Sequence, residues 1–212
     1  MHTKRKQQKG FTLVELLIVI TILVILGVVV VVLIDPAEIL AQSRDAQRIS
    51  DLASMKGAIQ LTVSSTTPSS ANCYIIAAPN GTNQPTANIF TTLMTAVGSS
   101  GYGITATATA QLVDGTGWVR LDYRAASTGK AMTSLPLDPT NALASGLYYR
   151  WGCNKYSTYL YEIDAALESE KYKPSCTATN CDDKASKDGG GSATRYEIGN
   201  TLDILPATAA LL

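Results

Sequence analysis

A nineteen-residue apolar run near the amino terminus limits what this chain can form more than any other feature. Residues Leu16–Ile34 are almost entirely Leu, Ile and Val, interrupted only by Thr21 and Gly27. With Phe11–Val14 added, the run reaches roughly 24 residues, or about 36 Å of α-helix, which is long enough to cross a bilayer. The sequence therefore predicts one membrane-spanning helix over residues 11–34.

Charged residues flank this run asymmetrically. Asp35 and Glu38 follow it, whereas the residues that precede it include Lys4, Arg5, Lys6 and Lys9. Because the cytoplasmic flanks of membrane helices are enriched in Lys and Arg, residues 1–10 are predicted to be cytoplasmic and the chain after Asp35 to lie across the membrane. A secretory signal has a shorter apolar core and a small-residue cleavage site after it, so the pattern favours a membrane anchor.

One acidic residue, Glu15, lies inside the apolar stretch, where a lone carboxylate is costly unless it is neutralised or paired with a cation. The stretch Gly10–Glu15 (GFTLVE), with a short basic leader before it and the apolar run after it, resembles the processing site of type IV pilins and pseudopilins. The resemblance implies that a prepilin peptidase cuts after Gly10 and that Phe11 becomes an N-methylated amino terminus. It also implies that Glu15 is an assembly carboxylate, with the new α-amine as its partner.

The same resemblance implies a structural, non-enzymatic role as the subunit of a type IV pilus-like filament. Expected partners are further copies of the chain, the prepilin peptidase, an inner-membrane platform protein and an assembly ATPase. Membrane lipid surrounds the helix before assembly, so the expected location is first the inner membrane, as a single-pass protein, and then a cell-surface or periplasmic filament. Two alternatives are a pseudopilin of a type II secretion or DNA-uptake system and a membrane-anchored extracytoplasmic enzyme or binding domain.

The expected fold is α+β, in four segments. Residues 1–10 form a cleaved leader, 11–34 a transmembrane and filament-core helix, 35–65 an amphipathic helix and 66–212 an extracytoplasmic globular domain. Pilin subunits carry one long amino-terminal helix whose second half packs on a small antiparallel β-sheet, and the resemblance implies the same here. Asp35 and Pro36 fit either a helix start, with Asp as N-cap and Pro at the first helical position, or a kink in one long helix. The resemblance favours the kink.

Residues 37–63 have the pattern of an amphipathic helix. Its apolar residues recur at three- and four-residue steps and are Leu40, Ile49, Leu52, Ala53, Ile59 and Val63. The charged residues assigned to the other side are Arg44, Asp45, Arg48, Asp51 and Lys56. We expect the apolar side to lie under the sheet and the charged side to meet either solvent or neighbouring subunits of a filament.

Shorter patterns predict the remaining elements. Residues 88–97 predict a short helix, and residues 104–112, 117–124, 147–152, 157–164 and 195–199 predict strands. The strands at 147–152 and 157–164 are expected to form a hairpin joined at Cys153–Tyr156. The motif LPLDPTN at 135–141, with the tyrosine-rich segments after it, resembles the loop and hairpin of the major pseudopilins of type II secretion.

Four cysteines lie beyond the predicted membrane helix, at Cys73, Cys153, Cys176 and Cys181. In an oxidising compartment they suggest two disulfides, for which three pairings exist. We favour Cys176–Cys181, which closes a small loop, and Cys73–Cys153, which ties the segment after the helix to the sheet. Zinc binding and free thiols are the alternatives, but the cysteine spacings are irregular for zinc.

Other features offer little chemistry. Asp182, Asp183 and Asp188 offer oxygen ligands for calcium, as in the carboxy-terminal loop of some major pseudopilins, but they lack EF-hand spacing and a solvated loop is favoured. No other cofactor is expected. His2 is the only histidine, and Ser127–Lys130 fits Ser-x-x-Lys without its partner motifs, so no catalytic set is predicted. Without the leader, 13 basic residues face 17 acidic ones and form no basic patch, so nucleic-acid binding is not expected.

Overall fold

The computed structural model divides the chain into two compact units, Met1–Leu40 and Ala41–Leu212, which are described separately. The residues that it describes are 10–66, 87–92, 98–99, 102–105, 111–127, 129–155, 159–174, 176–177, 181–202 and 204–205.

The first unit contains helix α1 (Leu13–Ile34) and the first turn of α2 (Pro36–Ser65). The segment Leu13–Val31 of α1 is long and apolar enough to cross a membrane. Between the helices, Asp35 has a φ of 44°, in the left-handed region, and its Oδ1 accepts a hydrogen bond from the N–H of Glu38 at 3.3 Å. With Pro36 as the first residue of α2, the chain shows a helix start at this point and not the kink in one long helix that the resemblance favoured.

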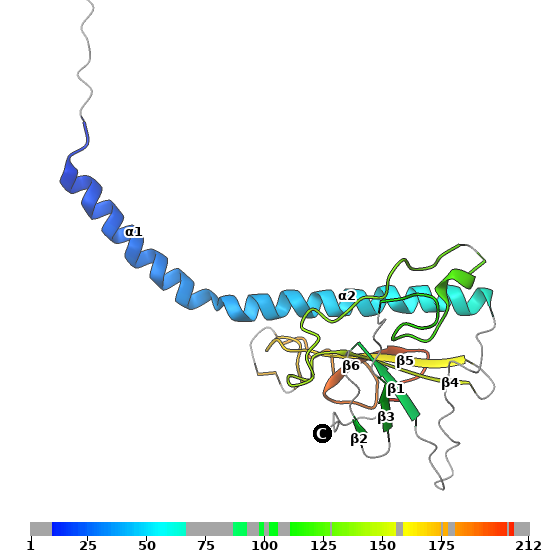
Figure 1. Cartoon of the computed structure of the whole chain (residues 1–212). Helices are drawn as coiled ribbons and strands as arrows, with labels where there is room; N and C mark the ends of the chain where they lie inside the picture. Colours follow the sequence, from blue (N-terminus) through cyan, green and yellow to red (C-terminus); the bar gives the residue numbers. More distant parts are fainter. Residues whose placement is uncertain are drawn as a thin grey trace, which may run out of the picture. The chain divides into compact units, whose positions relative to one another are not determined.

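The second unit places the rest of α2 along a six-stranded sheet of order β2-β3-β1-β4-β5-β6 (Figure 1). The strands are β1 (Ala87–Thr91), β2 (Gly98–Ser99), β3 (Tyr102–Thr105), β4 (Tyr149–Lys155), β5 (Tyr159–Ala166) and β6 (Arg195–Gly199). Neighbouring strands are antiparallel except β1 and β3, which are parallel. The predicted α+β fold, a long amino-terminal helical segment with a small sheet, is therefore confirmed.

The hydrophobic core lies between α2 and the sheet. Leu52, Met55 and Ile59 of α2 are fully buried and belong to the same cluster as Trp151 of β4 and Ile163 of β5. Strand residues alternate between the two faces of a sheet, so the neighbours of these core residues on β4, β5 and β6 point to the opposite face. That opposite face proves to be charged, as described below.

Two of the predicted elements are wrong. Residues 88–97 were expected to be helical, but Ala87–Thr91 forms β1, because its backbone pairs with β3 on one side and β4 on the other. Residues 117–124 were expected to form a strand. They contain only a bridge at Asp122 and a 3₁₀ turn (η2, Tyr123–Ala125), with apolar side chains buried in the core, so packing rather than a ladder fixes this segment.

The later strands agree with expectation more closely. The predicted hairpin is β4 and β5, paired from Tyr149–Ala165 to Lys155–Tyr159, and the last predicted strand coincides with β6. β4 extends to Lys155, so Cys153 belongs to the strand and not to the connection. The predicted strand at 104–112 overlaps β3 only at Ile104 and Thr105; Gln111 and Leu112 belong to no strand, and residues 106–110 lie outside the described part of the chain.

Candidate processing and assembly site

The start of α1 is built by a reciprocal pair of side chains. Thr12 is the N-cap residue, and its Oγ1 accepts a hydrogen bond from the N–H of Glu15 at 3.2 Å. In return, Oε2 of Glu15 accepts from the N–H of Thr12 at 2.9 Å and from its hydroxyl at 2.8 Å. This capping box satisfies N–H groups that the first turn of a helix otherwise leaves unpaired. The carboxylate of Glu15 is therefore held by its own chain.

The peptide bond between Gly10 and Phe11 lies just outside this first turn. Gly10 is exposed, and a side chain added to it would meet nothing within 4 Å. Phe11 is 87% exposed. Both residues precede the helix and are exposed, so the bond that joins them is accessible.

The described side chains of α1 are exposed. Its large apolar side chains from Leu13 to Val31 are 49% to 79% exposed wherever they are described. An apolar surface of this extent is stable only in lipid or against other apolar surfaces. The helix is therefore suited either to a membrane or to a bundle of like helices.

A family model described as the prokaryotic N-terminal methylation motif matches residues 5–33. The chain carries a class III prepilin leader. The match includes Gly10, Phe11 and Glu15 and most of α1, and it supports a pilin-like protein that is anchored in the membrane before assembly. No curated protein and no solved structure matches the chain significantly.

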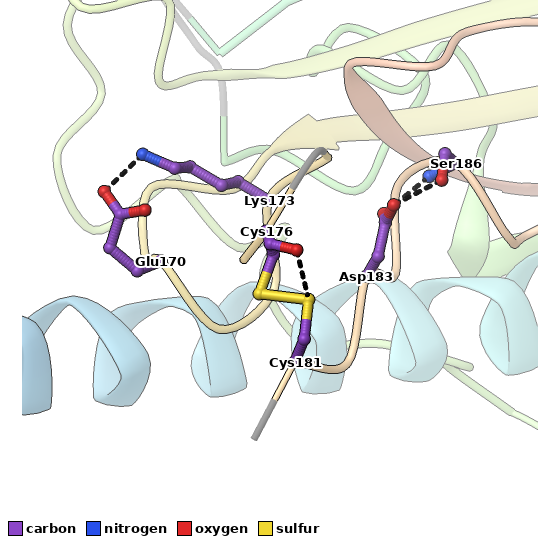
Figure 2. The surroundings of a disulfide bond; sticks show 6 residues. All are labelled: Glu170, Lys173, Cys176, Cys181, Asp183 and Ser186. Carbon is purple, nitrogen blue, oxygen red and sulfur yellow. Dashed lines mark hydrogen bonds and ion pairs between the residues drawn. A yellow bond between two sulfur atoms is a disulfide. The ribbon is translucent and has the colours of Figure 1, made fainter. Parts of the chain in front are cut away.

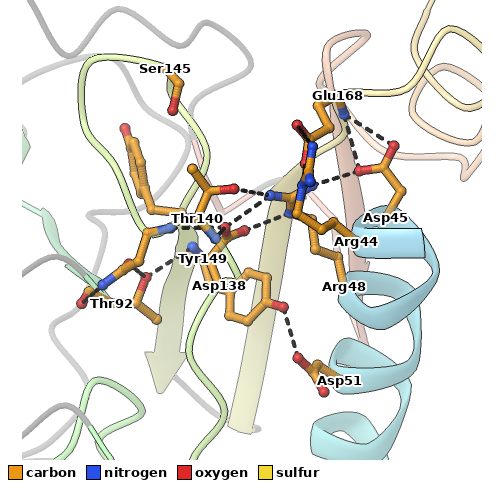
Figure 3. A network of polar contacts seen from close by, with 12 residues as sticks. Arg44, Asp45, Arg48, Asp51, Thr92, Asp138, Thr140, Ser145, Tyr149 and Glu168 are labelled. Carbon is orange, nitrogen blue, oxygen red and sulfur yellow. Dashed lines mark hydrogen bonds and ion pairs between the residues drawn. The ribbon is translucent and has the colours of Figure 1, made fainter. Parts of the chain in front are cut away.

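After α1 the chain continues into α2, and charged residues of α2 point into the globular unit. Arg48 is fully buried and donates to Asp138 through Nε at 2.7 Å and Nη2 at 3.0 Å. Its Nη1 donates to Asp45 and to Glu168, both at 2.7 Å (Figure 3). Burial lowers the pKa of Arg48, but the bonds to these carboxylates outweigh it and the net shift is upward.

The same network fixes the segments on either side of Arg48. Arg44 forms a bidentate pair with Glu168 at 2.7 and 2.9 Å, and this pairing lowers the pKa of the Glu168 carboxyl. Asp138 accepts the N–H groups of Thr140 and Asn141, which folds the 135–141 loop around it. The loop that resembles that of the major pseudopilins is thus the part of the domain that receives the helix arginine.

These contacts correct one sequence interpretation. Arg44, Asp45, Arg48 and Asp51 were expected on the outer side of α2, but Asp45 and Arg48 are buried, Arg44 pairs with Glu168 and Asp51 accepts from the Tyr149 hydroxyl. The exposed residues of α2 between Ala41 and Ser65 are instead all uncharged: Ser43, Ala46, Gln47, Ser50, Ala53, Ser54, Gly57, Gln60, Leu61 and Ser64. The outer face of this helix is neutral and mostly small.

The expected disulfide between Cys176 and Cys181 is confirmed, with 5.8 Å between the two Cα atoms (Figure 2). It occupies two of the four thiols that the zinc alternative needs. Cys73 lies outside the described residues, so its pairing with Cys153 stays a prediction.

The aspartates proposed for calcium make separate local contacts. Asp183 accepts from the N–H and hydroxyl of Ser186, and Asp182 pairs with Lys184 at 2.9 Å. Asp188 accepts from the N–H groups of Gly190 and Glu197 at 2.9 and 2.6 Å. A calcium site at these three residues stays a prediction.

Sequence reasoning missed two features of this protein. The capping role of Thr12 was signalled by the spacing Thr-x-x-Glu, which is the capping-box pattern. The buried charges of β4 to β6 had no such signal, because alternating polar residues in a strand normally predict a solvated face.

Proposed function

We propose that this chain is the structural subunit of a type IV pilus-like filament, cleaved after Gly10, N-methylated at Phe11 and polymerised through α1. The observation that carries the proposal is the combination of a prepilin leader with an apolar helix whose described side chains are exposed. The accessible Gly10–Phe11 bond supports processing by a prepilin peptidase. Assembly would then involve an inner-membrane platform protein and an assembly ATPase.

Cleavage creates a cation, which Glu15 lacks among its contacts in the uncut chain. The new α-amine of Phe11 lies four residues before Glu15, next to the first turn of α1. In a dry helix bundle, a carboxylate and an amine attract far more strongly than in water. A neighbouring amine can therefore draw the Glu15 carboxylate away from Thr12. Such a pair forms only at one axial offset between two helices, which gives the filament its register.

The outer face of α2 supports the same packing. Small residues let helix backbones approach closely, and a neutral face carries no charge that packing must desolvate. Because Arg44, Asp45 and Arg48 form ion pairs within the domain, that face can meet a neighbouring subunit.

Replacing Gly10 tests the proposal. Gly10→Val should keep the leader, seen as an unprocessed mass, and should abolish filaments in electron micrographs. Gly27→Val is the matched control for cleavage, since Gly27 also has nothing within 4 Å but lies far from the cut. Filaments made of uncleaved Gly10→Val subunits would contradict the proposal. If the chain were instead an anchored enzyme or binding domain, Gly10→Val would leave its activity unchanged.

The second candidate function is a pseudopilin of a type II secretion or DNA-uptake system. The 135–141 loop favours it, because its order of residues resembles that of major pseudopilins and because Asp138 anchors α2. Deletion of the gene distinguishes the two roles: loss of secreted proteins or of DNA uptake without loss of surface filaments favours the pseudopilin.

A further inference from the structure

The face of the sheet opposite α2 carries a layer of buried charge. Its members come from three adjacent strands and are between 0% and 2% exposed: Arg150, Glu162, Asp164, Arg195 and Glu197. The strand register places Arg150 beside Asp164 and Asp164 beside Glu197. Buried charges of this kind are stable only when they are paired and hydrogen-bonded.

Asp164 is fully paired. Arg150 donates to it through Nε at 2.9 and 2.8 Å, and Arg195 donates through Nε at 2.8 Å. Arg195 also donates to the carbonyl oxygens of Gly146 and Tyr148. One carboxylate thus uses two arginines at the centre of the layer.

Glu162 and Glu197 are only half satisfied. Oε2 of Glu162 accepts from the N–H groups of Ile204 and Leu205 at 2.7 and 2.9 Å, and Oε2 of Glu197 accepts from the N–H of Ser192 at 3.0 Å. The Oε1 atom of each side chain is buried and has no hydrogen-bond partner. Carboxylate oxygens of Glu162, Asp164 and Glu197 lie within 4.8 Å of one another.

The formal charges of this layer do not balance. With every group ionised, two arginines face three carboxylates, which leaves one buried negative charge uncompensated. Two buried carboxylates with oxygens within 4.8 Å of each other do not both ionise readily, because the two negative charges repel. One proton held between them removes this repulsion. A divalent cation would instead leave one excess positive charge beside two arginines.

We propose that Glu162 and Glu197 share one proton between their Oε1 atoms, and that this carboxyl pair fastens backbone segments 190–192 and 204–205 over the charged face of the sheet. Glu197 holds the first segment by accepting from the N–H of Ser192, and Glu162 holds the second by accepting from those of Ile204 and Leu205. Gly190 shows how closely the first segment approaches, since a Cβ there would lie 1.8 Å from Oε2 of Glu197.

The electrostatics of the site agree with a bound proton. Burial raises the pKa of Glu162 to about 8, against the lowering effect of the N–H groups of Leu205 and Ile204, with Asp164 and Glu197 raising it further. Burial also raises the pKa of Glu197, to which Asp164 and Asp188 add, while the N–H of Ser192 and the hydrogen bond with Glu162 lower it. The buried cations of the layer are Arg150 and Arg195, both already bonded to Asp164. Glu197 also borders a cavity that is lined by Lys56, Lys184 and Lys187, together with Asp182, Asp183 and Asp188.

The shared proton makes the fold depend on pH in a defined direction. Unfolding exposes Glu162, whose pKa then returns to about 4.5. Between about 4.5 and about 8 the folded protein therefore keeps a proton that the unfolded chain has lost. Stability from this proton is complete below the lower value and is lost as the pH rises to the upper one, and the unfolding equilibrium constant should rise roughly tenfold per pH unit.

Denaturant unfolding of the full chain in detergent, measured across this pH range, tests the proposal. Glu162→Gln cannot ionise, but its amide can donate to Glu197 and its carbonyl can accept from Ile204 and Leu205, so the tenfold-per-unit dependence should disappear. Glu197→Gln should do the same with the roles reversed and serves if the first variant fails to fold. Glu170→Gln, at a solvent-exposed residue, is the matched control and should keep the wild-type slope.

Infrared spectroscopy supplies an independent readout. The wild type and Glu170→Gln should show the C=O stretch of a protonated buried carboxyl at pH 6, and this band should be absent from Glu162→Gln. Equal pH slopes in the wild type and both pair variants, or no such band in the wild type, would overturn the proposal. Calcium binding by the wild type that Glu162→Gln abolishes would also overturn it, because a cation would then occupy the place of the proton.

Discussion

Replacement of Arg48 by Met should destabilise the globular unit strongly. Arg48 is fully buried, and its guanidinium donates to Asp138, Asp45 and Glu168. Met fills a similar volume but leaves Asp45 and Asp138, themselves buried, without their cation. Removing one partner of a buried ion pair costs about 3–5 kcal/mol, because the remaining charge stays desolvated.

A neighbouring pair on the same helix provides the comparison. Arg44 also bonds to Glu168, but its side chain is 37% exposed, so water screens the interaction. Exposed pairs of this kind contribute about 0–1 kcal/mol. Arg44→Met should therefore cost several kcal/mol less than Arg48→Met, although both remove one arginine from the same carboxylate.

The assay is urea unfolding of the purified full chain in detergent, followed by tryptophan fluorescence. Trp118 is a suitable reporter, because its Nε1 donates to the carbonyl of Pro136 at 3.0 Å, within the loop that Arg48 holds. The double variant Arg48→Met with Asp138→Asn should recover part of the loss, since the stranded charge is removed. Equal losses for Arg44→Met and Arg48→Met, or no recovery in the double variant, would refute the reasoning.

Two further predictions concern assembly and close packing. Glu15→Ala should leave leader cleavage intact, seen by mass, but should abolish filaments in electron micrographs, because the register pair is lost; normal filaments would count against an assembly role. Gly190→Ala should destabilise the domain by at least about 2 kcal/mol in thermal unfolding, since its Cβ would meet Glu197 at 1.8 Å. Gly57→Ala, at an open position on α2, is the control and should stabilise the helix by up to about 1 kcal/mol.

The features that the sequence predicted well depend on residues close together in the chain. The span of α1 follows from an unbroken apolar run, and the break before α2 follows from Asp35 and Pro36. The β4–β5 hairpin and β6 follow from short, aromatic-rich segments. The error at β1 has the opposite origin, because its pairing partners lie on β3 and β4, and the latter is about 60 residues away.

The sequence by itself determined the proposed amino-terminal site: Gly10, Phe11 and Glu15 lie within six residues, and the proposal rests on their order and spacing. Only the tertiary structure decided which charged side chains of the globular unit are buried and which groups they pair with. The partner of Arg48 is Asp138, 90 residues away, and the partner of Glu162 is Glu197 on a neighbouring strand. A charged side chain looks solvent-exposed in a one-dimensional pattern, and it becomes a core residue only when folding brings a counter-charge or a proton to it.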